Sequence, residues 1–299
     1  MKAVQWTVFI DMLGFKKLNS SVANDEQAQE LIKFMTTNRD VLTQHETYVE
    51  QYYKQDGEFN LYEWYDIKSA FISDSIVVTF KPKDVDREKN AKRVLMHSAN
   101  ALMLIVMRLG ALMHKSLLEK EITFRGGIST EYCDISESFA VGAGLSLANE
   151  AESNATYARL ALAEDVVRNA KLMMNVRELF KLMYGDSEFL VKEGGITYVN
   201  VLDFMLAGAD LKSPSVAMAI RTPQGRAAVT GVREQVEIFL EAQKALVVKS
   251  IREFYAAYRK SYVDEYSRRS NRHILKKYFW LRHHHNATVK QHQLEKFKI

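Results

Sequence analysis

Two aspartates, each next to an apolar run, are the first candidates for chemistry. Asp11 follows β-branched and aromatic residues in TVFIDMLGFKKL, and Asp74 lies in the short ISDS turn between two apolar runs. Alone, each has a plain structural role, Asp11 as a helix cap and Asp74 as a turn residue. Held together without a cation, two carboxylates repel one another, whereas carboxylates around two divalent ions are a common catalytic device. As a pair they indicate binding of Mg²⁺ or Mn²⁺.

The residues after Asp11 suit a phosphate group. The MLGF turn leads into an expected helix start, where backbone N–H groups are free to bind phosphate oxygens. Lys16 and Lys17 add positive charge. We therefore expect a phosphate-bearing substrate beside the aspartates.

Local patterns predict the elements that position these residues. The chain reads as strand, helix, strand, strand, helix, strand over residues 3–10, 24–48, 62–71, 76–81, 85–116 and 121–130. This is the ferredoxin-like order, in which the first and third strands are antiparallel neighbours. Asp11 should then lie close to Asp74.

Composition narrows the class of protein. The chain has 299 residues, 47% hydrophobic and 26% charged, as in soluble globular proteins. Cys133 is the single cysteine and cannot form an internal disulfide, which fits a reducing, cytoplasmic location. The N-terminus lacks a signal-peptide pattern. The most apolar stretch, residues 99–113, is interrupted by Asn100 and Arg108, so no membrane span is expected.

The last part of the chain is basic. From Arg221 onward there are 17 Lys and Arg against 7 Asp and Glu, whereas the preceding residues carry 24 against 30. Residues 232–266 form a long helical pattern with Gln243 as its only polar interruption on the apolar face. In residues 268–285, basic and aromatic residues interleave, as on a nucleic-acid surface. We favour the alternative, that this segment docks on the preceding domain and lends it positive charge.

Three consecutive histidines, His283, His284 and His285, end this basic stretch. On a helix they point in different directions, so they make a poor metal site. We expect a solvated or capping cluster.

Four segments together resemble the class III nucleotidyl cyclases. FIDMLGF and ISDSIVVTF resemble the metal-binding signature, FRGGIST the Arg-x-Gly-Ile strand, and VGAGLSLANEAES the segment that ends in a Glu-Ser pair. The resemblance covers about residues 4–200 in the family's order. It implies an α+β, ferredoxin-like βαββαβ catalytic domain with an antiparallel sheet over residues 1–205. Residues 206–299 would then form a mostly helical, basic extension packed on that core.

The resemblance also implies roles for individual residues. Asp11 and Asp74 would bind two Mg²⁺ or Mn²⁺ ions together with the carbonyl of Met12, and Arg125 would contact the phosphates. Gly14 and Phe15 would lie at the triphosphate. The ribose 3′-hydroxyl would attack the α-phosphorus in line and expel pyrophosphate. Active sites in this family form between two subunits, which implies a homodimer.

The departures from the family pattern concern base recognition and the transition state. Ala70 and Phe139 stand where purine cyclases carry polar base-reading residues. Ser146 stands at the transition-state asparagine, with Asn149 three residues on, and Glu150 replaces the expected arginine. The missing charge would come from the basic C-terminal part or from Lys68, unless the site is degenerate.

One branch of the family, the bacterial pyrimidine cyclases of the Pycsar anti-phage system, lacks the purine-reading residues and keeps the metal acids. This chain resembles that branch, which implies UTP as substrate, CTP as the alternative, and a separate effector protein that reads the cyclic product. Bulky aromatics would exclude purines, although each also fits ordinary core packing: Tyr62, Trp64, Tyr65, Phe71 and Phe139. A catalytically weak, cyclase-like regulator that binds nucleotide or nucleic acid is the second hypothesis.

Overall fold

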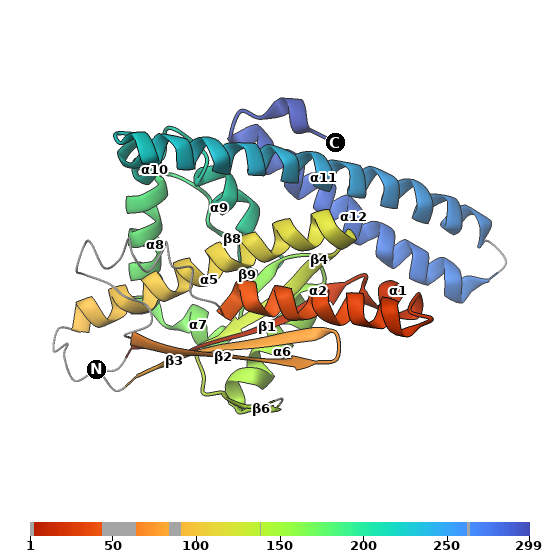
Figure 1. Cartoon of the computed structure of the whole chain (residues 1–299), viewed down its shortest axis with the longest axis horizontal. Helices are drawn as coiled ribbons and strands as arrows, with labels where there is room; N and C mark the ends of the chain where they lie inside the picture. Colours follow the sequence, from red (N-terminus) through yellow and green to blue (C-terminus); the bar gives the residue numbers. More distant parts are fainter. Residues whose placement is uncertain (1–2, 44–63, 84–90, 138, 262–263) are drawn as a thin grey trace.

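The computed structural model describes residues 3–43, 64–83, 91–137, 139–261 and 264–299. Its centre is a seven-stranded sheet in the order β2-β3-β1-β4-β7-β9-β8 (Figure 1). Neighbours within the first four positions are antiparallel, and β4 pairs with β7 in parallel. The strands are β1 Trp6–Leu13, β2 Tyr65–Ile72, β3 Ser75–Pro82, β4 Thr123–Ser129, β7 Leu160–Leu162, β8 Leu190–Glu193 and β9 Ile196–Val199. A separate ribbon pairs β5 Asp134–Ser136 with β6 Phe139–Val141.

Helices cover both faces of the sheet. The longer helices α2 and α5 lie on one face, and α6 packs against β1 and β4 on the other. The helices are α1 Phe15–Ser20, α2 Asp25–Thr43, α5 Ala91–Lys120, α6 Ala143–Ala155, α7 Glu164–Arg168, α8 Ala170–Tyr184, α9 Val201–Ala207, α10 Pro214–Ala219, α11 Pro223–Lys260 and α12 Glu265–Gln291. A 3₁₀ turn over Glu295–Phe297 follows α12. The order β1-α2-β2-β3-α5-β4 confirms the predicted α+β, ferredoxin-like class.

Strand alternation decides which side chains of β1 reach each face. Val8, Ile10 and Met12 are buried in the main core with α5, because successive strand residues point to opposite faces. The odd-numbered Phe9 packs instead with Leu145 of α6. The strand runs to Leu13, beyond the predicted end at residue 10, so Asp11 is a strand residue on the α6 face and not a helix cap.

Gly127 brings α6 directly onto β4. A Cβ atom at this position would lie 1.9 Å from the carbonyl oxygen of Ala148 and 2.8 Å from the amide nitrogen of Glu152. Only glycine permits this backbone approach. The buried face of α6 is otherwise built from small residues, and it carries one acid, Glu152.

Helix α5 is the central helix of the core. By length and composition, its segment Lys92–Lys120 is the one candidate membrane span in the part of the chain that the structure describes. However, 61% of its most apolar window is buried inside the structure. Leu102, Val106 and Leu109 pack in the same cluster as the sheet residues. The apolar surface of α5 is therefore largely buried in the protein core.

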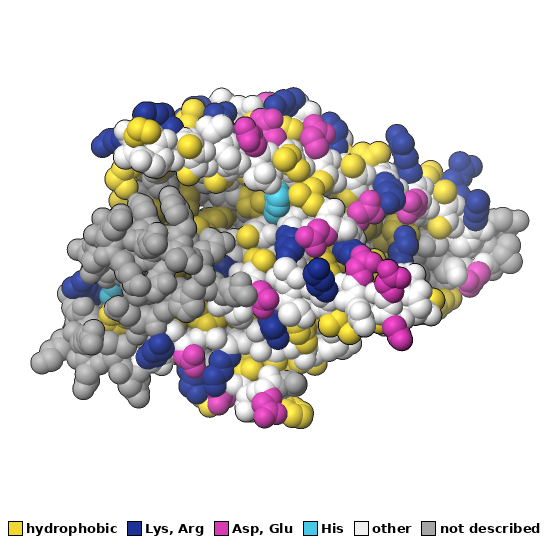
Figure 2. Space-filling view, viewed as in Figure 1, with side chains coloured by type: hydrophobic (Ala, Val, Ile, Leu, Met, Phe, Trp, Pro, Cys, Tyr) yellow, Lys and Arg dark blue, Asp and Glu magenta, His cyan; other side chains and the backbone are white. Residues whose placement is uncertain are grey.

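Helices α11 and α12 form an antiparallel hairpin across the α5 side (Figure 1). Phe239, Leu240 and Val289 of the hairpin share one apolar cluster with Leu117 of α5 and Leu202 of α9. Several Lys and Arg side chains line the outer part of the hairpin in Figure 2. The α11–α12 hairpin therefore packs on α5 and α9 and also presents a basic surface.

Two predicted boundaries change. The single helix predicted over 232–266 is wrong, because α11 ends at Lys260 and a new helix begins at Glu265, capped by the Asp264 carboxylate. The predicted division after residue 205 falls inside α9, and the division into two domains stays a prediction. Parts of the predicted helices over 24–48 and 85–116, and Tyr62, lie outside the described residues.

Candidate active site

Asp11 and Asp74 come together at one end of the sheet. Asp11 is opposite Ser75 in the β1–β3 ladder, and Asp74 is the residue just before Ser75 in the turn between β2 and β3. The amide nitrogen of Met12 donates to the carbonyl oxygen of Asp74 over 3.3 Å. This bond ties the turn to β1 and holds Asp74 next to Asp11, as the predicted strand order implies.

Arg125 joins Asp11 from the other side. The two residues are directly opposite in the β1–β4 ladder, and Nη2 of Arg125 donates to Oδ2 of Asp11 over 3.2 Å. The Nε atom of Arg125 forms an ion pair with Oε1 of the buried Glu152, although the geometry is not that of a hydrogen bond. One guanidinium thus lies between two carboxylates.

Glu152 is the site residue that sequence reasoning missed. It lies in the quoted Glu-Ser pair and falls four residues after Ala148, on the small-residue face of α6. Residues four apart lie on the same face of a helix, so Glu152 shares the face of Ala148 that packs on β4. Buried acids are rare without a partner. An acid on an otherwise small-residue helix face therefore indicates a positively charged side chain nearby.

Negative charge is in excess in this cluster. Burial raises the pKa of Asp11, and the Glu152 carboxylate raises it further. The Arg125 guanidinium opposes this pKa rise, and Asp74 adds to it. A bound cation would relieve this repulsion between carboxylates.

The donor set suits Mg²⁺ or Mn²⁺, which prefer oxygen ligands. Among the residues that the structure describes, no group of three or more His, Cys, Asp or Glu side chains is placed to hold a metal ion. Mg²⁺ is usually bound by one or two carboxylates together with substrate phosphates and water, and the assignment of Asp11 and Asp74 as metal ligands stays a prediction. The role of the Met12 carbonyl stays a prediction.

Gly14 and Phe15 form the turn after β1. Gly14 has φ 101°, a left-handed conformation that favours glycine, and it is the N-cap residue of α1. Phe15 is buried in the main core and anchors the turn. Lys16 and Lys17 are exposed. Contact of this turn with a triphosphate stays a prediction.

The two predicted base-reading positions lie in different surroundings. Ala70 is buried against Val77, Cys133 and Ile135. Phe139 is 73% exposed on the β5–β6 ribbon. The structure does not place them in one closed pocket of a single chain.

Tyr65 requires a correction. Its side chain is 1% exposed in the main core, and its hydroxyl donates to the carbonyl oxygen of Val4 over 3.1 Å. Burial raises the pKa of this hydroxyl. The predicted contact of Tyr65 with a base is wrong, because no surface is left for it. Trp64 and Phe71 also pack against the core, which was the open alternative for these aromatics.

Ser146, Asn149 and Glu150 are all exposed on α6. Ser146 and Glu150 lie on the side of the helix opposite its buried face, whereas Asn149, three residues before Glu152, lies at the edge of that face. Lys68 has its nitrogen 3.7 Å from the Asp134 carboxylate, so its charge is engaged there. None of these residues supplies a positive charge to the aspartates of the same chain.

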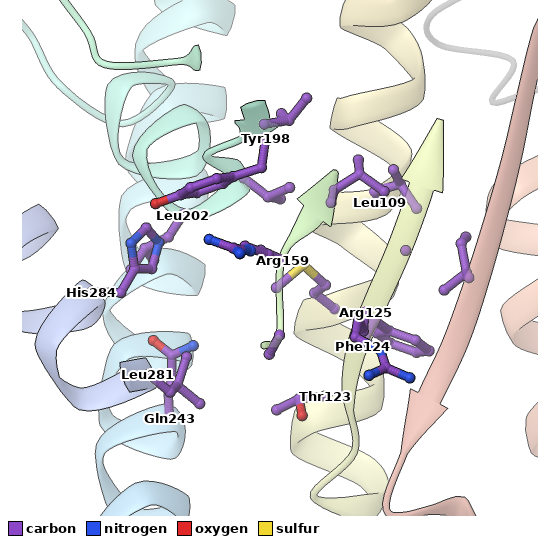
Figure 3. A pocket seen from close by; sticks show the side chains of 17 residues that line it. Leu109, Thr123, Phe124, Arg125, Arg159, Tyr198, Leu202, Gln243, Leu281 and His284 are labelled. Atoms are coloured by element: carbon purple, nitrogen blue, oxygen red, sulfur yellow. The ribbon is translucent and has the colours of Figure 1, made fainter. Parts of the chain in front are cut away.

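A cavity separates the sheet from the C-terminal hairpin beside Arg125. Figure 3 shows Gln243, Leu281 and His284 facing Arg159 and the start of β4 across this space. Its volume of about 40 Å³ holds a few water molecules and not a nucleotide. Because Leu281 and His284 of α12 line the same cavity as Arg125, this helix passes close to Arg125.

The predicted solvated histidine cluster is wrong for two of its three members. His285 is fully buried, with Nδ1 2.7 Å from Oε1 of Gln243 and Nε2 3.0 Å from the carbonyl oxygen of Phe297. His284 stacks on Trp280 at 4.9 Å, and burial lowers its pKa to about 4. Only His283 is exposed.

No protein-family model matches the sequence, and no curated protein matches it. Several solved structures are similar, among them three cyclases. The guanylyl cyclase Cya2 is 12% identical, with 67% of this chain and 93% of that chain covered and a TM-score of 0.32. A bacterial light-regulated adenylyl cyclase is 12% identical, with 78% and 57% covered and a TM-score of 0.34. The catalytic core of a rhodopsin-guanylyl cyclase with converted specificity, in complex with ATPαS, is 15% identical, with 66% and 95% covered and a TM-score of 0.32.

The chain therefore spans just over half of the light-regulated adenylyl cyclase. At TM-scores of 0.32–0.34, this likeness by itself establishes neither the family nor the activity of this chain. The α+β, ferredoxin-like class of the fold follows from the strand order and register of this chain.

Proposed function

We propose that this chain is a metal-dependent nucleotidyl cyclase, which converts a nucleoside triphosphate to a 3′,5′-cyclic nucleotide and pyrophosphate. The observation that carries the proposal is the meeting of Asp11 and Asp74 at one sheet end beside Arg125. Two strands and a hairpin turn, far apart in sequence, deliver these three residues to one place.

The residues have separable roles in the proposed reaction. Asp11 and Asp74 would hold the divalent ions, which when bound lower the pKa of the ribose 3′-hydroxyl and neutralise the triphosphate. Arg125 offers a guanidinium fork of the kind that binds phosphate oxygens. Glu152 holds the Nε side of that guanidinium, so it is a positioning residue.

A pyrimidine triphosphate is the proposed substrate, UTP first and CTP second. The support is that Ala70 and Phe139 offer no polar group at the predicted base-reading positions. A buried purine edge without partners would cost about 1–3 kcal/mol for each unpaired group. The order of UTP before CTP rests on the family resemblance. The product, cyclic UMP, would act as a second messenger in anti-phage defence and be read by a separate effector.

We further propose a homodimer with its active sites between subunits. Ser146 and Asn149 are exposed on α6, so they are free to serve the site of a second copy. The β5–β6 region exposes apolar side chains next to this helix: Tyr132, Phe139 and Val141. Exposed apolar surface of this kind is typical of an interface.

A second candidate is a catalytically weak, nucleotide-binding regulator. Glu150 places an exposed carboxylate where the family carries an arginine, and Asp11 is already paired with Arg125. Glu150 would repel the negative charge that builds up in the transition state, and the pairing with Asp11 would keep Arg125 from stabilising it.

One assay separates these two candidates. The protein is incubated with ATP, GTP, UTP or CTP and Mn²⁺, and the cyclic products are resolved by chromatography. We expect cyclic UMP, or cyclic CMP, in excess over the purine products. Faster turnover of ATP or GTP would overturn the substrate proposal, and the absence of every cyclic product would favour the regulator.

A further inference from the structure

Helix α12 passes close to the carboxylate cluster. Leu281 and His284 of this helix line the same cavity as Arg125 (Figure 3). Lys277 precedes Leu281 by four residues, so it lies on the same helix face one turn nearer the hairpin tip. The face of α12 that carries Leu281 thus brings an ammonium group toward the start of β4.

The surroundings of Lys277 agree with that placement. Its side chain is partly buried. Burial lowers its pKa, the Arg125 charge lowers it further, and the carboxylates of Asp11 and Glu152 oppose both effects. All three charged groups that act on it belong to the candidate site. Its neighbour Lys276 is exposed.

Among the residues that the structure describes, Lys277 has no partner for its charge. Within the part of the chain that the structure describes, no ion pair or hydrogen bond engages its ammonium group. A partly buried lysine without a partner is unfavourable. An anionic ligand at the cluster would supply the missing partner.

We infer that Lys277 is a phosphate-binding residue of this site, a cation that the C-terminal helix delivers to the oligophosphate of the substrate. The inference rests on the proposed function and names a source for the charge that Glu150 fails to provide. Lysine binds phosphate as a compact point charge and needs no fixed fork geometry. Its natural targets here are the triphosphate and the pyrophosphate that leaves.

The test uses inorganic tripolyphosphate with Mg²⁺, and calorimetry measures its binding to the full chain. Lys277→Met keeps the apolar stem of the side chain and removes the charge. We expect this variant to bind tripolyphosphate about tenfold more weakly, the usual loss for one charge-assisted contact. The matched control Lys276→Met should bind within twofold of the wild type, and Lys277→Arg should restore part of the affinity.

Thermal unfolding of each variant shows whether it is folded. Equal tripolyphosphate binding by folded Lys277→Met and wild type would overturn the inference, as would an equal loss in Lys276→Met. A wild-type chain that binds tripolyphosphate through Lys277 and cyclises no nucleotide would overturn the proposed function alone. If the wild type is an active cyclase and Lys277→Met has unchanged KM and kcat, the inference fails and the proposed function stands.

Discussion

Asp11 and Arg125 are directly opposed residues of neighbouring antiparallel strands, and their side chains meet at 3.2 Å. If Asp11 holds a divalent ion as proposed, the arginine and that ion would compete for the same carboxylate. Charge–charge energies at such distances are several kcal/mol at the dielectric constants typical near a protein surface. Under the proposed function, Arg125 would exchange its partner Asp11 for the substrate phosphates when the site is occupied.

Neutralising either aspartate should abolish cyclisation. Asp11→Asn and Asp74→Asn keep the side-chain volume and remove the charge that would hold the divalent ions. We expect both variants to stay folded, because Asp11 suffers repulsion from Glu152 and Asp74. Cyclase assays with Mn²⁺ and thermal unfolding measure the two effects. Asp186→Asn is the control, since that carboxylate is 96% exposed. Activity retained in either site variant contradicts the two-metal assignment.

Two aromatic truncations should have opposite consequences. Tyr65→Ala should lower the free energy of unfolding by about 3–5 kcal/mol, because it opens a cavity in the core. Phe139→Ala should change it by less than about 0.5 kcal/mol, because the ring is exposed. If Phe139 excludes purines, this variant should gain turnover of ATP or GTP. Denaturant unfolding and product analysis check both statements, and an unchanged product pattern would remove Phe139 from the base site.

Mixing two inactive variants should restore activity if sites form between subunits. Asp11→Asn damages the part of a site that would bind the metal ions. Asn149→Ala damages the part that we assign to the other subunit. Random pairing leaves one intact site in each mixed dimer, so we expect up to about a quarter of wild-type activity. Size-exclusion chromatography with light scattering gives the oligomeric state. An active protein that is monomeric throughout the assay range would exclude the arrangement.

His284 should make stability depend on pH. The unfolded chain takes up this proton near pH 6.5, whereas burial and the charges of His285, His283 and Arg159 hold the folded pKa at about 4. Unfolding is therefore favoured as the pH falls from 6.5 to 4, with a slope of at most about 1.4 kcal/mol per pH unit. His284→Phe keeps a ring against Trp280 and removes the titration. The pH slope of unfolding should be smaller in this variant, and identical slopes would contradict the assignment.

A pair of glycine substitutions tests the contact between α6 and β4. Gly127→Ala should cost about 1–3 kcal/mol or more, because the new Cβ meets the backbone of Ala148. At Gly231 in α11, an added Cβ would meet no atom within 4 Å outside its own helix backbone, so Gly231→Ala should stabilise the chain by about 0.5–1 kcal/mol. Denaturant unfolding of both variants gives the comparison. Equal stability of Gly127→Ala and wild type would mean that α6 moves without cost.

Local patterns were enough to predict the order of the first four sheet strands and the approach of Asp11 to Asp74, because alternation and turn residues fix register within a hairpin. They did not predict the three further strands, β7, β8 and β9. They were not enough for the Arg125–Glu152 pair, which exists only because α6 docks on β4. The core position of Tyr65 could not be predicted either, because an aromatic residue in a strand fits a protein core and a ligand pocket equally well. The break between α11 and α12 was missed because helical periodicity continues across it, although Asp264 is a capping residue.

The close approach at Gly127 also bears on how this chain can be recognised in distant relatives. Apolar residues elsewhere in the core can be exchanged for others of similar volume, so overall identity can fall very low while the fold persists. Position 127 has no such freedom, because any side chain would displace α6 and with it Glu152. A glycine two residues after a strand arginine, followed by a helix with small residues and one acid on the same face, should therefore outlast most of the sequence. We expect that short combination to identify distant relatives better than similarity summed over the whole chain.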